Sequence, residues 1–308
     1  MLLCPGQGAQ RVGMGRDLAE KFPQAQEVFE TIDEALGFPL SKLMWEGPES
    51  ELTLTHNAQP AILAHSLAVW AVAQNALAPA LAAGHSLGEY TAYAAAGALA
   101  TSDAARLVRR RGELMFEAGE ARPGSMAAVI GLDGDRVASV CAAASSGDEV
   151  AVAANLNAPE QTVISGDPRA VRRAGEMLLK AGAKRVMPLK VSGAFHSPLM
   201  EPAREGLSTE LERVSLGDPA FPVIANSTAE PVRDASVARE RLADQLTAPV
   251  QWVRSMERAT KEAGEGTTFV EIGPGAILSG LVRRIRKGSV AMPLGDAGQV
   301  AAFLEERE

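Results

Sequence analysis

The order of elements between residues 123 and 192 constrains the fold of this chain more than any other feature of its sequence. Short apolar runs predict strands at residues 126–132, 150–155, 161–165 and 185–191, and helical spacing predicts helices at 135–145 and 168–181. The order β-α-β-β-α-β is a known supersecondary unit, complete here within about 70 residues. We therefore expect residues 123–192 to form a small inserted subdomain.

The segments on either side of this unit predict one larger domain. Short apolar stretches alternate with alanine-rich helical patterns, including helices at 61–75 and 103–118, the second capped by Ser102-Asp103. Buried strands at 221–225 and 268–272 follow the insertion. Such alternation is typical of a parallel sheet covered by helices. We expect an α/β fold in which residues 1–122 and 193–308 form a discontinuous, hydrolase-like sheet core, with a ferredoxin-like α+β subdomain inserted into it.

The composition narrows the classes of protein to which the chain can belong. It has 308 residues, 46% of them hydrophobic, and a net charge of -8, which disfavours nucleic acid because phosphate backbones require a basic face. Cys4 and Cys141 match neither a disulfide framework nor a metal-ligand spacing. Polar residues and a proline interrupt the longest apolar region, 61–83. We expect a cytoplasmic protein without a signal peptide, a membrane span or a metal.

Gly84-His85-Ser86-Leu87-Gly88 fits the GxSxG nucleophile elbow, in which a sharp turn holds a serine at the start of a helix. A short apolar segment, 80–83, precedes the motif, and a helical run, 89–99, follows it. The serine hydroxyl becomes a good nucleophile only when a base takes its proton, and a neutral histidine suits that role. A tight, non-catalytic turn is the alternative interpretation.

Four histidines could supply this base. His85 is expected to be structural, since neighbouring side chains at an elbow point apart, and His65 lies on an apolar helix, where a core role is the more common one. His56 is predicted to be a loop residue. His196 follows the insertion directly, at an edge where a cleft can form. The pattern alone leaves its role open.

Six motifs follow one another along essentially the whole chain. They are Pro5-Gly6-Gln7-Gly8-Ala9-Gln10, Gly84-His85-Ser86-Leu87-Gly88-Glu89-Tyr90, Arg111-Gly112, Ala194-Phe195-His196-Ser197, Pro249-Val250-Gln251-Trp252 and Glu271-Ile272-Gly273-Pro274-Gly275. In this order they resemble the malonyl-CoA:acyl carrier protein transacylase family, the acyltransferases of fatty-acid and polyketide synthesis. Several separated motifs in sequence are far more specific than any one of them.

The resemblance implies a catalytic dyad in place of a triad. Ser86 would be the nucleophile and His196 its general base, with the backbone carbonyl of Gln251 orienting the imidazole where a triad has an aspartate. The backbone N–H groups of Gln7 and Leu87 would form the oxyanion hole.

The resemblance also implies the substrate-binding residues. Arg111 would bind the malonyl carboxylate with two parallel hydrogen bonds, whereas its neighbours Arg109 and Arg110 are expected to be solvated. The Gln251 side chain and Phe195 would shape the pocket, and the Phe195 ring would crowd the branched α-carbon of a methylmalonyl group. Gln59 and Asn155 would have supporting roles.

The function implied is an S-malonyltransferase that carries malonyl from malonyl-CoA to the phosphopantetheine thiol of acyl carrier protein through a malonyl ester of Ser86. Coenzyme A is then part of a substrate, and no cofactor is expected. We expect a monomer that binds neither nucleic acid nor membrane. A serine thioesterase or esterase is the first alternative, and a non-catalytic acyl-binding protein is the second. Two basic groups could dock an acidic carrier or be ordinary solvated faces: Arg283, Arg284, Arg286 and Lys287, and Lys184, Arg185 and Lys190.

Overall fold

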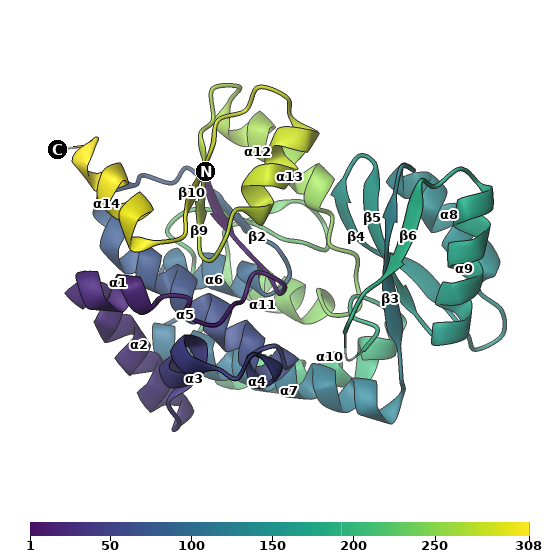
Figure 1. Ribbon diagram of the computed structural model, residues 1–308, viewed down its shortest axis with the longest axis horizontal. Coiled ribbons are helices and arrows are strands. Elements are labelled where there is room, and N and C mark those ends of the chain that lie inside the picture. Colours follow the sequence, from purple (N-terminus) through teal and green to yellow (C-terminus); the bar gives the residue numbers. More distant parts are fainter. Residues whose placement is uncertain (192, 308) are drawn as a thin grey trace.

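The computed structural model describes residues 1–191 and 193–307, whose strands form two separate sheets (Figure 1). The strands are β1 (Leu2–Cys4), β2 (Ala82–Gly84), β3 (Ser125–Ile130), β4 (Ala151–Ala158), β5 (Gln161–Gly166), β6 (Arg185–Pro188), β7 (Val223–Ile224), β8 (Pro231–Val232), β9 (Phe269–Ile272) and β10 (Ala291–Leu294). The helices are α1 (Arg16–Lys21), α2 (Pro23–Leu36), α3 (Leu40–Glu46), α4 (Glu49–Leu52), α5 (Thr55–Ala73), α6 (Gly88–Ala95), α7 (Thr101–Ala121), α8 (Gly134–Ala144), α9 (Pro168–Lys180), α10 (Glu201–Arg213), α11 (Ala235–Asp244), α12 (Trp252–Ala263), α13 (Ile277–Ile285) and α14 (Ala297–Glu305), with short 3-10 turns η1 (Gln74–Ala76) and η2 (Pro198–Met200).

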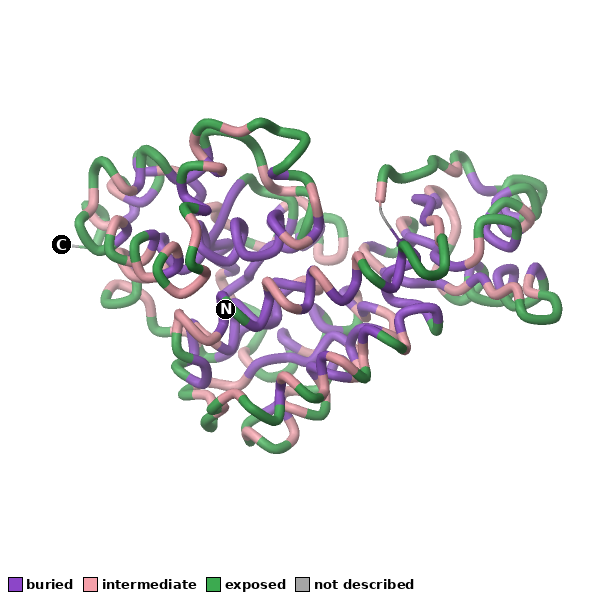
Figure 2. The backbone as a smooth tube through the Cα atoms, turned by 90° about the horizontal axis from the view of Figure 1, so that it is seen from below, coloured by how far each residue is buried: buried purple, intermediate pink, exposed green. Residues whose placement is uncertain are grey.

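The larger sheet has six strands in the order β10-β9-β1-β2-β7-β8, and all neighbours run parallel except the pair β7 and β8. Strands β1 and β2 are buried along their whole length, as expected for a parallel sheet covered by helices. Figure 2 shows that buried residues follow the inner segments of the molecule and exposed ones the outer loops. The predicted α/β fold with a parallel sheet is confirmed.

Two helices of the larger part differ from the sequence prediction. Helix α5 begins at Thr55, six residues before the predicted start, and continues through Pro60. His56 therefore lies in the first turn of a helix, and its prediction as a loop residue was wrong. Helix α7 begins at Thr101 with Ala100 as its N-cap, and no side chain caps it. The predicted cap at Ser102-Asp103 was also wrong, since both residues lie inside the helix.

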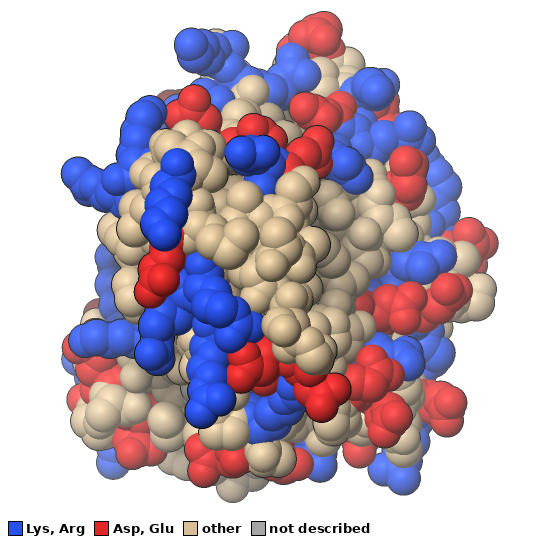
Figure 3. All heavy atoms as spheres, turned by 90° about the vertical axis from the view of Figure 1, so that its right-hand side faces the viewer, with Lys and Arg blue, Asp and Glu red and all other residues tan. Residues whose placement is uncertain are grey.

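The smaller sheet has the order β4-β5-β3-β6, all antiparallel, with α8 and α9 packed against it. Its elements follow one another as predicted, with ends shifted by a few residues. Val129, Val137, Ile164 and Leu178 belong to a hydrophobic cluster of its own. Its outer face carries charges of both signs around an uncharged area (Figure 3).

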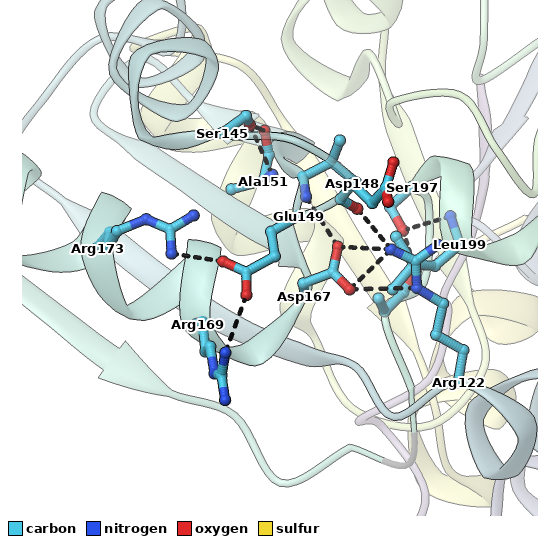
Figure 4. Close-up of polar contacts among 12 residues, drawn as sticks. Arg122, Ser145, Asp148, Glu149, Ala151, Asp167, Arg169, Arg173, Ser197 and Leu199 are labelled. Carbon is cyan, nitrogen blue, oxygen red and sulfur yellow. Dashed lines mark hydrogen bonds and ion pairs between the residues drawn. The ribbon is translucent and has the colours of Figure 1, made fainter.

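The chain passes from α7 to the smaller sheet at Arg122, the first residue after the helix. Its guanidinium donates to both carboxylate oxygens of Asp167, at 2.9 and 3.1 Å, and to the carbonyl of Asp148 at 2.7 Å (Figure 4). Asp167 also accepts from the N–H of Val150. A bidentate arginine–carboxylate pair defines direction as well as distance. This contact joins the end of α7 to the loops of the smaller sheet.

None of the helices in the described part of the chain has both the length and the apolar character that a membrane crossing requires.

Candidate active site

The turn between β2 and α6 holds Ser86 in the left-handed region, with a φ of 52°. For a residue with a side chain this conformation costs roughly 1 kcal/mol or more. A Cβ atom on Gly84 would lie 1.8 Å from the backbone of Gly88, and one on Gly88 would lie 2.0 Å from the carbonyl of Cys4. Only glycine fits at either position, so the sequence pattern does form a sharp nucleophile elbow.

The structure brings Ser86 and His196 together from positions 110 residues apart, with 2.8 Å between Oγ and Nε2. The other ring nitrogen, Nδ1, lies 2.9 Å from the carbonyl oxygen of Gln245. Since a carbonyl can only accept, Nδ1 carries the proton and Nε2 is free to accept one from the serine.

The carbonyl that orients the imidazole comes from a different residue than predicted. The prediction named Gln251, but Gln251 is the N-cap of α12 and its N–H donates to the carbonyl of Asn226. Gln245, directly after α11, supplies the carbonyl. The assignment to Gln251 was therefore wrong, although a backbone carbonyl does occupy the place of an aspartate.

Burial, and after it the positive charge of Arg111, lower the pKa of His196 to about 3, although the hydrogen bond to the Gln245 carbonyl acts in the opposite direction. The imidazole is thus neutral at neutral pH. A neutral ring with Nε2 unprotonated is the form that a general base needs.

Arg111 lies on α7 and is 1% exposed. Its guanidinium donates to Ser86 Oγ at 3.1 Å and to Gln245 Oε1 at 2.8 Å, and it also reaches Gln59 Oε1. It lies over the Tyr90 ring, 5.3 Å from the ring centre. No carboxylate of the described residues pairs with it, and its Nε has no acceptor among them. The nearby carboxyl group of Glu89 interacts with Arg111 electrostatically but makes no ion pair with it, so the guanidinium can still bind an anion beside Ser86.

The two arginines beside Arg111 differ from each other. Arg110 pairs with Glu113 and Glu117 at the surface, as expected of a solvated residue. Arg109 is partly buried: it pairs with Glu113 at 2.7 Å, donates to the carbonyl of His56 at 3.1 Å, and lies over the Phe38 ring. Its prediction as a solvated residue was wrong.

The N-terminal loop lies directly against the elbow. A Cβ on Gly6 would be 2.4 Å from the carbonyl oxygen of His85. The side chain of Gln7 accepts from Thr55 Oγ1 at 2.9 Å, and Thr55 in turn accepts from Gln59 Nε2 at 3.0 Å. The main-chain N–H of Gln7 and that of Leu87 donate to no acceptor in the described residues. Both donors are therefore available to a ligand.

The remaining candidates lie at different distances from this network. Gln59 belongs to it through Arg111. Phe195 is 6% exposed and packs into the core of the larger part, next to His196 in the chain. Asn155 is buried, and its backbone forms a bridge with Val250. Neither the Asn155 side chain nor that of Gln251 makes a hydrogen bond with the dyad or with Arg111 among the described residues.

Sequence reasoning missed four polar residues that surround the elbow. Asn226 Oδ1 accepts from the Ser86 N–H at 2.7 Å, and its Nδ2 donates to the Gly84 carbonyl at 2.6 Å. Asn157 Oδ1 lies 2.7 Å from His85 Nε2, which turns His85 away from the dyad, as predicted. The other two are Gln245 and Glu89. Asn226 lies two residues after strand β7, and a polar residue near the carboxyl end of a parallel strand was the signal available.

Glu89 is fully buried in the first turn of α6. Burial raises the pKa of its carboxyl group to about 7, and the hydrogen bonds from Asn226 and Gln245 oppose that shift. Within the described residues no group of three or more His, Cys, Asp or Glu side chains is arranged to hold a metal ion.

An elbow serine whose histidine is held by a main-chain carbonyl, on a mixed α/β fold, defines the class of serine enzymes that transfer acyl groups. Within this class the chain belongs to the acyl transferase family: the family described as "Acyl transferase domain" matches residues 1–297.

Named relatives and solved structures agree with this assignment. The malonyl CoA-acyl carrier protein transacylase of Bacillus subtilis is 44% identical over 96% of this chain and 92% of its own length, and that of Escherichia coli is 42% identical over 98% and 97%. An acyl carrier protein S-malonyltransferase from Vibrio cholerae superposes with a TM-score of 0.94 at 40% identity, covering 98% of each chain. A malonyl-transacylase in complex with the acyl-carrier protein of a type II polyketide synthase has a TM-score of 0.93 at 41% identity, covering 99% of this chain and 98% of that one.

Proposed function

We propose that this protein transfers the malonyl group of malonyl-CoA to the phosphopantetheine thiol of acyl carrier protein, in fatty-acid or polyketide synthesis. One observation carries the proposal: the Arg111 guanidinium, buried and without a carboxylate partner in the described residues, lies 3.1 Å from the Ser86 hydroxyl. A donor with a free acid group at one end and a thioester at the other can use both. The names of the relatives point to the same reaction.

The first half-reaction forms an ester. His196 Nε2 takes the Ser86 proton while Oγ attacks the thioester carbonyl, and the N–H groups of Gln7 and Leu87 stabilise the oxyanion. The C–S bond then breaks, and the imidazolium returns its proton to the departing coenzyme A thiolate. Arg111 gives up its hydrogen bond to Ser86 and binds the malonyl carboxylate. Coenzyme A leaves as a product and is no cofactor.

The second half-reaction repeats these steps with another thiol. The phosphopantetheine thiol gives its proton to His196 and attacks the ester carbonyl, and the Ser86 oxygen leaves and recovers the proton. Phe195 contributes specificity in this proposal, because its ring, buried beside His196, limits the space for a branched α-carbon. Gln59 supports the reaction by holding Arg111, whereas the position of Asn155 and Gln251 supports no direct role.

The proposal extends to the carrier protein and to the organisation of the chain. Arg284 is the favoured member of its basic group for docking, because it reaches Gln161 of the smaller sheet at 2.7 Å and so lies at the junction of the two sheets. Arg283 and Arg286 already bind the Ala291 carbonyl and Glu265. Arg185 is the first residue of β6, and Lys184 precedes it. Neutralising Arg284 should weaken carrier binding most at low salt.

We also propose that residues 123–192 form one subdomain and residues 1–122 with 193–308 the other; Figure 1 shows the two sheets at separate ends of the molecule. Residues 192 and 308 lie outside the described residues. The protein would act as a monomer in the cytoplasm, in keeping with Cys4 and Cys141, which are buried and unpaired.

A transfer assay tests the function directly. The protein is mixed with malonyl-CoA with and without the phosphopantetheine form of a carrier protein, and the products are followed by mass spectrometry. We expect malonyl carrier with the wild type, a malonyl adduct on Ser86 when the carrier is left out, and neither product with Ser86→Ala. Free malonate as the main product in both mixtures would identify a thioesterase instead. Absence of any adduct would favour a non-catalytic acyl-binding protein.

A further inference from the structure

A buried carboxylate lies beside the dyad and takes no part in the steps above. Glu89 is in the first turn of α6, with none of its surface exposed. Its Oε2 accepts two hydrogen bonds, from the N–H of Asn226 at 3.0 Å and from Nε2 of Gln245 at 2.7 Å. Burying an ionisable group is costly unless hydrogen bonds compensate it. An apolar side chain would avoid that cost, so the acidic group needs a reason at this position.

Both partners of Glu89 hold the catalytic residues. Asn226 accepts from the N–H of Ser86 at 2.7 Å, and Gln245 donates to the carbonyl of Ser86 at 3.0 Å. The carbonyl of Gln245 orients the imidazole of His196. One carboxylate oxygen thus connects the segment that carries the nucleophile with the segment that orients the base.

The same hydrogen bonds determine which way the Gln245 amide faces. Its NH₂ group donates to Glu89 and to the Ser86 carbonyl, so its Oε1 is left to accept from Arg111 at 2.8 Å. In the opposite orientation the NH₂ group would face the guanidinium, a donor against a donor. An acceptor at position 89 therefore favours the orientation in which Gln245 can hold Arg111.

We propose that Glu89 is a positioning residue, which acts through Asn226 and Gln245 and does not touch the substrate. By accepting their hydrogen bonds it holds the elbow and the orienting carbonyl in one arrangement. Oε1 has no partner among the described residues, so a neutral carboxyl group would carry its proton there. Oε2 can therefore accept in either protonation state, and the role depends on the acceptor rather than on the charge.

Two variants of nearly the same size separate these contributions. Glu89→Gln keeps an accepting oxygen and removes the charge, whereas Glu89→Met removes both and leaves little cavity. The first readout is the second-order rate at which phenylmethanesulfonyl fluoride, a neutral probe, sulfonylates Ser86 with loss of fluoride. We expect the methionine variant to react about 100-fold more slowly than the wild type and the glutamine variant to stay within about tenfold of it.

The second readout is the ratio of malonyl to acetyl loading on Ser86, which rests on the proposed function. It should fall in Glu89→Met, because Gln245 no longer holds Arg111 firmly, and should recover in Glu89→Gln. A general loss of folded protein would lower both loading rates equally and leave their ratio unchanged.

Both variants must first show cooperative thermal unfolding. The inference would then be overturned if Glu89→Met reacted with the probe at the wild-type rate, or if the reaction rate fell equally in the two variants. A wild type that reacts with the probe but loads no malonyl group would overturn the proposed function alone, and the probe rates would still decide the role of Glu89. Should Glu89→Met not fold, Glu89→Leu removes the same acceptor with a different apolar side chain. A wild-type probe rate there would contradict the inference, and a comparable fall would support it.

Discussion

Ser86 and His196 meet at 2.8 Å, and both have a backbone in the left-handed region, with φ values of 52° and 57°. Of the three residues other than glycine with positive φ in the described chain, these two are the proposed nucleophile and general base. Such conformations persist only where the surrounding structure imposes them. The glycines of the elbow and the buried bridge through Gln245 are what impose it here.

This conformation predicts a gain in stability from a glycine at position 86. We expect the free energy of unfolding of Ser86→Gly to exceed that of Ser86→Ala by about 1 kcal/mol, because alanine still carries the strain of the left-handed region. Urea unfolding measures the difference. Ser197, with a φ of -137°, is the matched control, and there the alanine variant should be the more stable one. If the same variant, glycine or alanine, were the more stable one at both positions, the result would argue against strain at the elbow.

Replacing Arg111 should remove the preference for malonyl. Arg111→Ala should lower malonyl loading relative to acetyl loading by an amount equivalent to about 2 to 5 kcal/mol, and Arg111→Lys should recover little of it, since an ammonium group lacks the two parallel donors. Competing malonyl-CoA and acetyl-CoA for Ser86 gives the ratio by intact mass. Arg110→Ala, in the surface pairs next to it, is the control and should leave the ratio unchanged.

The pH profile of Ser86 modification should lack an inflection in the usual histidine range. Because burial and Arg111 lower the pKa of His196 to about 3, the ring stays unprotonated as the solution is acidified. The rate constant for phenylmethanesulfonyl fluoride should remain level from about pH 8 to about pH 5. Arg111→Gln removes a repelling charge, so its inflection should move upward. Circular dichroism at each pH checks that the protein remains folded, and an inflection near 6.5 in the wild type would contradict this assignment.

Moving the N-terminal loop should slow acyl transfer without unfolding the protein. Gly6→Ala places a methyl group 2.4 Å from the His85 carbonyl oxygen, which must push the Gln7 N–H away from the elbow. Losing one oxyanion donor costs about 3 to 4 kcal/mol, so kcat should fall by about 100-fold to 1,000-fold. Gly266→Ala, where nothing lies within 4 Å of the added atom, is the control. Unchanged kcat in Gly6→Ala would exclude Gln7 from the oxyanion hole.

Glu89 should make stability depend on pH. Its pKa is raised from an ordinary 4.5 to about 7, so its contribution to stability is fully present below 4.5 and is lost as the pH rises through 7. Arg111, Tyr90 and Tyr93 are the titratable groups that interact with it. Between pH 5 and pH 8 the free energy of unfolding of the wild type should fall by about 2 to 3 kcal/mol relative to Glu89→Gln. Urea unfolding of both proteins at the two pH values measures this difference. If the free energy of unfolding changed equally in the two proteins, Glu89 would be ionised throughout this pH range.

Sequence reasoning reached the features that side-chain patterns encode. The order of elements in the smaller sheet follows from local periodicity, and the serine of the elbow follows from its glycines. Periodicity could not show that β1 pairs with β9, because that contact joins Leu2 to Val270. Pro60 concealed the start of α5, since a proline in the second turn of a helix reads as a boundary.

The error at Gln251 has a physical cause. A main-chain carbonyl is present at every residue, so nothing in a side chain marks the one that holds an imidazole, and two glutamines stand six positions apart in this segment. Glu89 and Asn226 escaped notice because burial is a property of the folded chain. A lone acid at the start of an alanine-rich helix, directly after the elbow, was the one indication that the sequence offered.

The smaller sheet is entered through β3 and left through β6, and these strands are hydrogen-bonded neighbours, with Ala127 opposite Pro188. The chain therefore enters and leaves the smaller sheet at two neighbouring positions. A segment with such an arrangement can be exchanged for a longer or shorter one, or for a tight hairpin, while the host sheet keeps its strand order. Evolution and protein engineering can thus change the smaller sheet while Ser86, on the turn after β2 of the larger sheet, keeps its place.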